Sequence, residues 1–244
     1  MRLFYFLFLL SFSVFAQNPK LEVKINSITN EVVSDNCTEY QINYQIENKT
    51  SNALSFFLLP NALIANTASS LTLYPVYKMY QNGVFEDMDG PFFEYETEIE
   101  LKYAKMEDKK SVEAKKLIER IQKLNSYLFS INYKKYKANG GKSNDLNWIH
   151  ENQKLLNNII ILKPYETRNF TIRTLWNKNR FIKNDDLEFY LDSNNKIEIE
   201  LILDLKTNLF SDQLSEEDLK KINENPNFIK GYFVSNKTVV NFKE

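Results

Sequence analysis

The chain contains very few of the residues that most often perform catalysis or hold metal ions. Among its 244 residues there is one cysteine, Cys37, and one histidine, His150. One cysteine cannot form an internal disulfide, and a zinc site usually needs several cysteine or histidine ligands. A Ser-His-Asp triad needs a carboxylate that orients the histidine, and the adjacent Glu151 would point elsewhere on a helix. We therefore predict no catalytic residue, no metal site and no cofactor. Cys37 is interpreted as a small buried residue in or beside a strand, and His150 as a surface or interface residue.

Neither sign of charge dominates the composition, and glycine is scarce. The sequence has 31 lysine and arginine residues against 32 aspartate and glutamate residues, for a net charge of -1. We therefore expect neither nucleic acid nor an anionic membrane to bind over a large surface. Two of the 5 glycines lie in Gly140-Gly141-Lys142-Ser143, which resembles the end of a phosphate-binding loop. The full pattern needs a glycine where Tyr136 stands and a strand before it, so we reject a nucleotide site.

Long apolar segments are absent after the first sixteen residues. Arg2 is followed by an apolar run to Phe15, and small residues, Val14 and Ala16, precede Gln17. This layout is typical of a cleaved secretory signal peptide, and the run is shorter than the roughly 20 residues that a spanning helix needs. A lipid anchor would need a cysteine where Gln17 stands. We expect a soluble protein, exported to the periplasm or the extracellular space, that is not a lipoprotein and has no transmembrane segment after cleavage.

Residues 17–244 show the two-residue alternation of half-buried strands in many places. Apolar and polar residues alternate over residues 40–48, 93–103 and 170–176. Residues 187–191 and 196–205 flank Asp192-Ser193-Asn194-Asn195 as a hairpin, and a last strand is expected over residues 228–242. About eight to ten short strands separated by turns predict a mainly β, antiparallel β-sandwich that forms a single domain. The alternative is two small domains that meet near Tyr103.

Helical spacing replaces alternation in the middle of the chain. Leu117, Ile121, Leu124 and Leu128 recur three or four residues apart and predict a helix over residues 107–129. A polar loop over residues 134–144 should follow, and Asp145 should cap a second helix. We expect a helical hairpin inserted over about residues 105–158, which the sandwich can lose without unfolding. A short helix should begin after Ser215, before the last strand.

Three segments resemble bacterial extracytoplasmic immunoglobulin-like domains. They are the strand at residues 40–48, the turn at residues 162–167 that leads into the strand at residues 170–176, and the closing hairpin with the last strand. Such domains often carry Leu-x-Pro-Gly-Glu-Thr before a strand, and Tyr165 takes the place of the glycine here. The immunoglobulin Cys…Trp…Cys signature is absent. The resemblance implies an immunoglobulin-like β-sandwich and names no function, because function depends on sites rather than on folds.

Other patterns in the sequence are compatible with a functional site but also occur on ordinary protein surfaces. Alternating glutamates at positions 94, 96, 98 and 100 have a spacing that a glycosidase could use, and residues 86–90 are acidic enough to hold calcium. A solvated strand face and a solvated turn explain these two patterns better. Exposed tyrosines can stack on sugars or anchor a protein partner, and the weak binding candidates are Tyr74, Tyr77, Tyr80, Tyr133 and Tyr136.

The sequence therefore predicts an exported, non-catalytic protein that binds a protein or a cell-envelope component. The abundance of Asn, Lys and Ile with few glycines is typical of bacterial coding from an AT-rich genome. The helical insertion is the expected binding surface, because function concentrates in insertions on a rigid scaffold. Two alternatives stay open: an extracytoplasmic hydrolase that acts on polysaccharide or peptide, and a structural subunit of the envelope.

Overall fold

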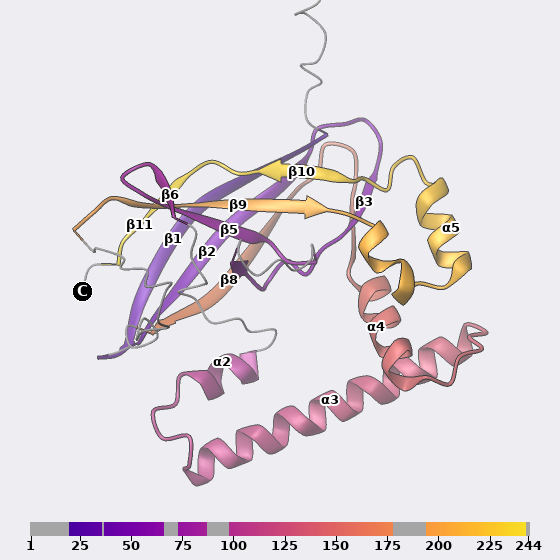
Figure 1. Ribbon diagram of the computed structural model, residues 1–244, viewed down its shortest axis with the longest axis horizontal. Helices are drawn as coiled ribbons and strands as arrows, with labels where there is room; N and C mark the ends of the chain where they lie inside the picture. The colour runs from indigo at the N-terminus through magenta and orange to yellow at the C-terminus, as the bar shows by residue number, and fades with distance from the viewer. Residues whose placement is uncertain (1–19, 36, 66–72, 87–97, 178–193, 243–244) are drawn as a thin grey trace, which may run out of the picture.

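The computed structural model describes residues 20–35, 37–65, 73–86, 98–177 and 194–242, and these residues form a mainly β structure (Figure 1). The predicted signal peptide, with Ala16 and Gln17 at its cleavage site, lies outside the described residues. The same holds for residues 187–191, the first arm of the predicted hairpin.

The first sheet is antiparallel and has the strand order β1-β2-β8. It comprises β1 (Leu21–Ser34), β2 (Cys37–Asn48) and β8 (Thr167–Asn177). The alternation seen in the sequence is confirmed, because Tyr40, Ile42, Tyr44 and Ile46 are buried on one face of β2. A turn precedes β8, as predicted, and Tyr165 adopts a positive φ of 56° there, the backbone conformation that a glycine would favour.

The second sheet is mixed, which the expectation of a purely antiparallel fold did not foresee. Its main path is β10-β9-β5-β4, where β4 (Ile64–Ala65) runs parallel to β5 (Val76–Gln81). The other pairs of this sheet are antiparallel: β9 (Ile197–Leu205) and β6 (Val84–Glu86) pair with β5. On the other edge of β9, β10 (Gly231–Val234) and β11 (Thr238–Val240) pair with β9. A separate two-stranded sheet pairs β3 (Leu54–Phe57) with β7 (Ile159–Leu162).

The predicted last strand is present as two pieces, β10 and β11, which both pair with β9. Ser235 interrupts it and keeps the connection to β9: its backbone N–H donates to the Leu201 carbonyl, and its Oγ accepts from the Leu201 N–H. Asn236 then joins the sheets, because its side-chain amide hydrogen-bonds the N–H and the carbonyl of Ile25 on β1. The chain therefore bends at Ser235-Asn236, which divides the predicted strand into two.

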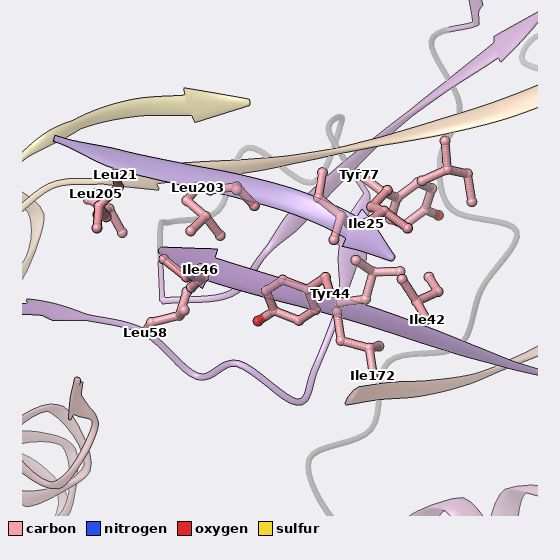
Figure 2. Packing of buried hydrophobic residues seen from close by; sticks show 14 of the residues in the cluster. Leu21, Ile25, Ile42, Tyr44, Ile46, Leu58, Tyr77, Ile172, Leu203 and Leu205 are labelled. Carbon is pink, nitrogen blue, oxygen red and sulfur yellow. The ribbon is translucent and has the colours of Figure 1, made fainter. Parts of the chain in front are cut away.

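The main core lies between the two larger sheets. Their inner faces contribute to one cluster of buried side chains, with further members from β3, β7 and the connecting segments. Figure 2 shows Ile25 and Tyr44 of the first sheet near Tyr77 and Leu203 of the second. The Tyr44 hydroxyl donates to the Pro60 carbonyl at 2.8 Å, which satisfies the polar end of a fully buried ring.

The helices lie outside the sheets (Figure 1). They are α2 (Glu98–Ala104), α3 (Val112–Ala138), α4 (Leu146–Asn157), the 3-10 helix η2 (Asn208–Gln213) and α5 (Glu216–Glu224). In Figure 1, α4 and α5 lie to the right of the strands, and α2 and α3 lie below them. The predicted caps are confirmed, with Asp145 before α4 and Ser215 before α5. None of the helices in the described part of the chain is long and apolar enough to cross a membrane.

Two predictions in the helical region were wrong. The alternating segment at residues 93–103 is helical from Glu98 onward, because α2 packs Leu101 and Ala104, three residues apart, against Cys37 and Leu175. The segment predicted as a loop from residue 134 continues α3 to Ala138. Its lysines and tyrosines are compatible with a helix, and the turn begins only at Asn139 and Gly140.

A second core joins α4 to the C-terminal helices. Leu155 of α4 is fully buried in a cluster with Phe57, Phe210, Leu214, Ile222 and Phe228, which belong to β3, η2, α5 and the segments beside them. Phe57 makes edge contacts with Phe210 and Phe228 at ring-centroid distances of 5.7 and 5.0 Å. The helical segment is therefore anchored in the fold through α4.

Candidate binding cleft

A cleft of about 600 Å³ opens between the α3–α4 turn, one side of α4 and the beginning of α5. Of the three walls, the α3–α4 turn and α4 are neighbours in the sequence, and the beginning of α5 follows about sixty residues after α4. The lining residues are Tyr136, Asn139, Gly140, Gly141, Lys142, Asn152, Gln153, Leu156, Ser215, Glu216, Glu217, Asp218 and Lys221. The lining is mostly polar, with both charge signs, one aromatic ring and one leucine.

Two buried amides on α4 form the inner wall. Asn152 is 1% exposed and Gln153 is 3% exposed. Asn152 donates from Nδ2 to the Gln213 carbonyl at 2.9 Å and accepts at Oδ1 from Gln153 Nε2 at 3.0 Å. The Gln153 carbonyl oxygen accepts no hydrogen bond from the described residues. This oxygen does not belong to the buried unpaired atoms of the described residues, so solvent reaches it, and it is an available acceptor for a ligand in the cleft.

The beginning of α5 forms the second wall. Ser215 Oγ accepts from the Asp218 N–H at 3.1 Å and donates to Asp218 Oδ2 at 2.6 Å, a reciprocal cap that fixes this end of the helix. Lys221 donates to Glu217 at 2.6 Å, and this hydrogen bond lowers the pKa of the Glu217 carboxyl. A general acid at neutral pH needs a raised carboxyl pKa, so Glu217 has the opposite property. Glu216 has no ion pair among the described residues and leaves its carboxylate open as a second acceptor.

Tyr136 of α3 forms the third wall and is held in place by the turn that follows it. Its hydroxyl accepts from the Ser143 N–H at 3.2 Å, and its ring meets the edge of Trp148 at a centroid distance of 5.6 Å. Gly141 lies directly against the ring: a Cβ there would stand 2.2 Å from a ring carbon. The absence of that Cβ lets the turn fold over Tyr136.

The structure brings one of the five tyrosine candidates into the cleft. Tyr136 lines the cleft. Tyr133 lies about one turn earlier on α3, and the Lys137 ammonium lies over its ring, 5.7 Å from the ring centroid. The others lie elsewhere: Tyr77 is buried in the main core, and Tyr74 packs beside the second core. Tyr80 donates to Glu200 at 2.7 Å on the outer face of the second sheet, where burial and this hydrogen bond raise its pKa to about 12.

The single histidine and the single cysteine have structural surroundings. His150 stacks on Phe129 at 3.9 Å, and its Nδ1 lies 3.1 Å from Asn132 Nδ2, so it joins α4 to α3 as an interface residue, as predicted. Cys37 is buried at the start of β2, also as predicted, and burial raises the pKa of its thiol. Beside it, Glu39 is buried and pairs with Lys105 and Arg173.

The acidic candidates do not form a site in the described part of the chain. Glu98 and Glu100 belong to helix α2, so the four glutamates do not lie on one strand face. Glu94, Glu96 and residues 87–90 lie outside the described residues. Among the residues described, no group of three or more histidine, cysteine, aspartate or glutamate side chains is placed to hold a metal ion.

The cleft residues that sequence reasoning missed are Asn152, Gln153 and the start of α5. A signal for the two amides was present, because Ile149, Asn152, Gln153 and Leu156 follow the spacing of the buried face of a helix. Amides at buried positions of such a face need partners, and here one of them points to a ligand site. Comparisons of this chain with models of protein families, with curated proteins and with solved structures find no match.

Proposed function

We propose that this chain is an exported binding protein of the bacterial cell envelope that holds a hydroxyl-rich ligand, such as a saccharide, in the cleft beside α4. The observation that carries the proposal is Gln153, whose side chain is held in place by its hydrogen bond to Asn152 while its solvent-reached carbonyl oxygen accepts no hydrogen bond from the described residues. With the open carboxylate of Glu216, it offers two acceptors for hydroxyl groups, and Lys142 offers a donor. The ring of Tyr136 supplies an apolar wall for a sugar ring.

Binding without catalysis is the form of the proposal that the cleft favours. A glycosidase needs two carboxyl groups, one of which stays protonated near neutral pH. The pKa of Glu217 is lowered by Lys221, and Asp218 is engaged in the cap of α5. The hydrolase alternative therefore has less support from this cleft than the binding function.

The proposal also includes export from the cytoplasm and an immunoglobulin-like sandwich as the fold. The apolar run before Gln17 supports a cleaved signal peptide and a soluble protein in the periplasm or outside the cell. The antiparallel pairs β1-β2-β8 and β5-β9-β10, which share one core, support an immunoglobulin-like sandwich in a single domain. The parallel strand β4 and the helices are departures from that pattern.

Glycan binding by the chain from Gln17 onward tests the proposal. An array of bacterial envelope saccharides, including peptidoglycan fragments and lipopolysaccharide oligosaccharides, should retain the protein, and calorimetry should confirm the best ligand. Gln153→Leu preserves the size of the side chain and removes the acceptor, so affinity should fall by about tenfold or more. The matched control is Gln122→Leu on the exposed part of α3, which should leave affinity unchanged.

Three outcomes would contradict the proposal. No retained saccharide would remove the ligand class. Equal affinity of the Gln153→Leu and Gln122→Leu variants would place binding outside this cleft. Release of new reducing ends from a bound saccharide would favour the hydrolase alternative.

A further inference from the structure

Helix α3 is attached at its two ends and lacks a packing partner, among the described residues, along the outward side of its middle. Near its start, Ala114 and Leu117 are buried, and Glu113 pairs with Lys102 of α2 at 3.7 Å. Near its end, Asn132 is buried and contacts His150 of α4. Figure 1 shows α3 at the margin of the molecule, far from the strands, with α2 beside its first half and α4 near its last turns.

The middle of α3 exposes large apolar side chains. Tyr127 is 63% exposed, and Leu128 and Ile131 are each 39% exposed. Ile131 follows Tyr127 by four residues and Leu128 by three, and residues at these spacings are neighbours on the surface of a helix. The three side chains therefore lie together on one side of α3. We call them the α3 apolar patch. It differs from isolated exposed residues because its members are contiguous.

Basic side chains surround the patch on the same side of the helix. Arg120, Lys123 and Lys134 lie four or seven residues from Tyr127, so helical periodicity places them in one stripe with it. All three are exposed and make no ion pair with the described residues. The helix as a whole has seven lysine and arginine residues and two glutamates, a net charge of +5. Because the whole chain has a net charge of -1, the remaining residues sum to -6.

We infer that α3 docks on the surface of an anionic lipid bilayer. The patch would enter the boundary between headgroups and acyl chains, and Arg120, Lys123 and Lys134 would contact lipid phosphates. Charge complementarity selects an anionic partner. The apolar patch selects a bilayer over a nucleic acid or an anionic polysaccharide, because only a bilayer offers an apolar phase for Tyr127, Leu128 and Ile131. The net charge of the whole chain is close to zero because the acidic remainder offsets this basic helix. The composition therefore predicted no binding to an anionic membrane surface, although α3 is locally basic. The inference does not depend on the cleft.

Vesicle co-sedimentation of the chain from Gln17 onward tests the inference. This protein keeps every described residue and omits the apolar run at residues 3–15, which could itself bind lipid. At low salt it should sediment with vesicles of phosphatidylglycerol and phosphatidylcholine and not with pure phosphatidylcholine. Added salt should weaken the binding, because counterions screen exposed charges.

Two α3 variants separate the electrostatic and apolar contributions. Arg120→Gln/Lys123→Gln/Lys134→Gln should lower the partition coefficient between vesicle and solution by at least about tenfold. Each basic residue near an anionic membrane surface usually adds to the binding free energy, and this variant removes three of them. Tyr127→Ser/Leu128→Ser/Ile131→Ser should reduce it by a similar factor and abolish any shift in tyrosine fluorescence on binding. Circular dichroism should show that both variants keep their helical content, because the altered side chains are exposed.

The controls make the same chemical changes elsewhere on the surface. Lys20→Gln/Lys24→Gln/Lys220→Gln removes three exposed lysines outside α3, and Val84→Ser/Val239→Ser removes exposed apolar side chains of the second sheet. Both should sediment like the unaltered protein. The inference is overturned if anionic vesicles do not bind the protein at low salt. It is also overturned if the control variants lose as much binding as the α3 variants, or if a single protein partner protects the α3 patch while vesicles do not.

Discussion

Helices α3 and α4 are joined by the short connection at residues 139–145, yet they have opposite relations to the rest of the molecule. Helix α4 has 12 residues, of which Ile149, Asn152, Gln153 and Leu155 are buried. Helix α3 has 27 residues, of which only Ala114, Leu117 and Asn132 are buried. Both show apolar residues at helical spacing in the sequence. The comparison teaches that such spacing identifies a helix but does not say whether its apolar side has a partner within the chain.

The difference arises from what each helix faces. Helix α4 meets η2 and α5 through the second core, and Trp148 Nε1 donates to the Asp212 carbonyl at 2.7 Å. Among the described residues, helix α3 meets α2 near its start and α4 from Phe129 onward, and its outward side has no neighbour. The expectation that residues 105–158 can be removed as a unit conflicts with the burial of Leu155, since that deletion would expose the second core. The functional surfaces follow the same division, with the cleft on the buried helix and the bilayer surface on the exposed one.

The largest expected effect comes from the same substitution made on the two helices. Leu155→Ala should lower the free energy of unfolding by about 2–5 kcal/mol, because it leaves a cavity in the second core. Leu128→Ala on α3 should change it by less than about 0.5 kcal/mol, because that side chain is exposed. Guanidinium unfolding of both variants measures the difference. Similar losses for the two variants would show that α3 is packed as firmly as α4.

The sequence predicted the parts of the fold whose local pattern and final environment agree. Strands β2 and β8 alternate because one face of each is buried, and α4 and α5 begin where Asp145 and Ser215 supply caps. The strand predicted through Tyr103 was wrong because a short segment fits both periods, and contacts between α2 and the distant Cys37 and Leu175 decide it. Such contacts join residues far apart in the sequence, so local patterns do not report them.

The candidate site was less predictable than the fold. Tyr136 was identified as a binding candidate, but the same reasoning also selected Tyr77, which is buried in the core. The cleft exists because the α3–α4 turn and the start of α5 meet on the two sides of Gln153. Nothing in the local sequence states that residues near 140, 153 and 216 come together. The buried-face spacing of Asn152 and Gln153 was the one usable signal.

A pair of neighbouring glycines tests how firmly the α3–α4 turn holds the cleft. Gly141→Ala places a Cβ against the Tyr136 ring, which must move, and should cost about 1–3 kcal/mol of stability. It should also change the fluorescence of Trp148, which contacts that ring. In Gly140→Ala the new Cβ has no atom within 4 Å, so the only cost is that an alanine must adopt the positive φ of 82° found at this position. Its cost should be about 1 kcal/mol, with unchanged Trp148 fluorescence. An equal fluorescence change in both variants would mean that the turn moves as a whole.

The smallest expected effect distinguishes the two helix caps. Asp145 accepts hydrogen bonds from the N–H groups of Asn147 and Trp148 at 3.0 and 3.1 Å, and Ser111 accepts one from Ala114 at 3.0 Å. Asp145→Ala should lower the global free energy of unfolding by about 1 kcal/mol, because α4 unfolds together with the second core. Ser111→Ala should mainly increase amide hydrogen exchange in the first turns of α3, with a smaller change in global stability, because a sparsely packed helix opens locally. If both substitutions lower global stability equally and exchange stays unchanged in α3, then α3 belongs to the same cooperative unit as α4. In that case the contrast between the two helices would be one of solvent exposure only, and the exposed side of α3 would be a rigid surface rather than a separately opening arm.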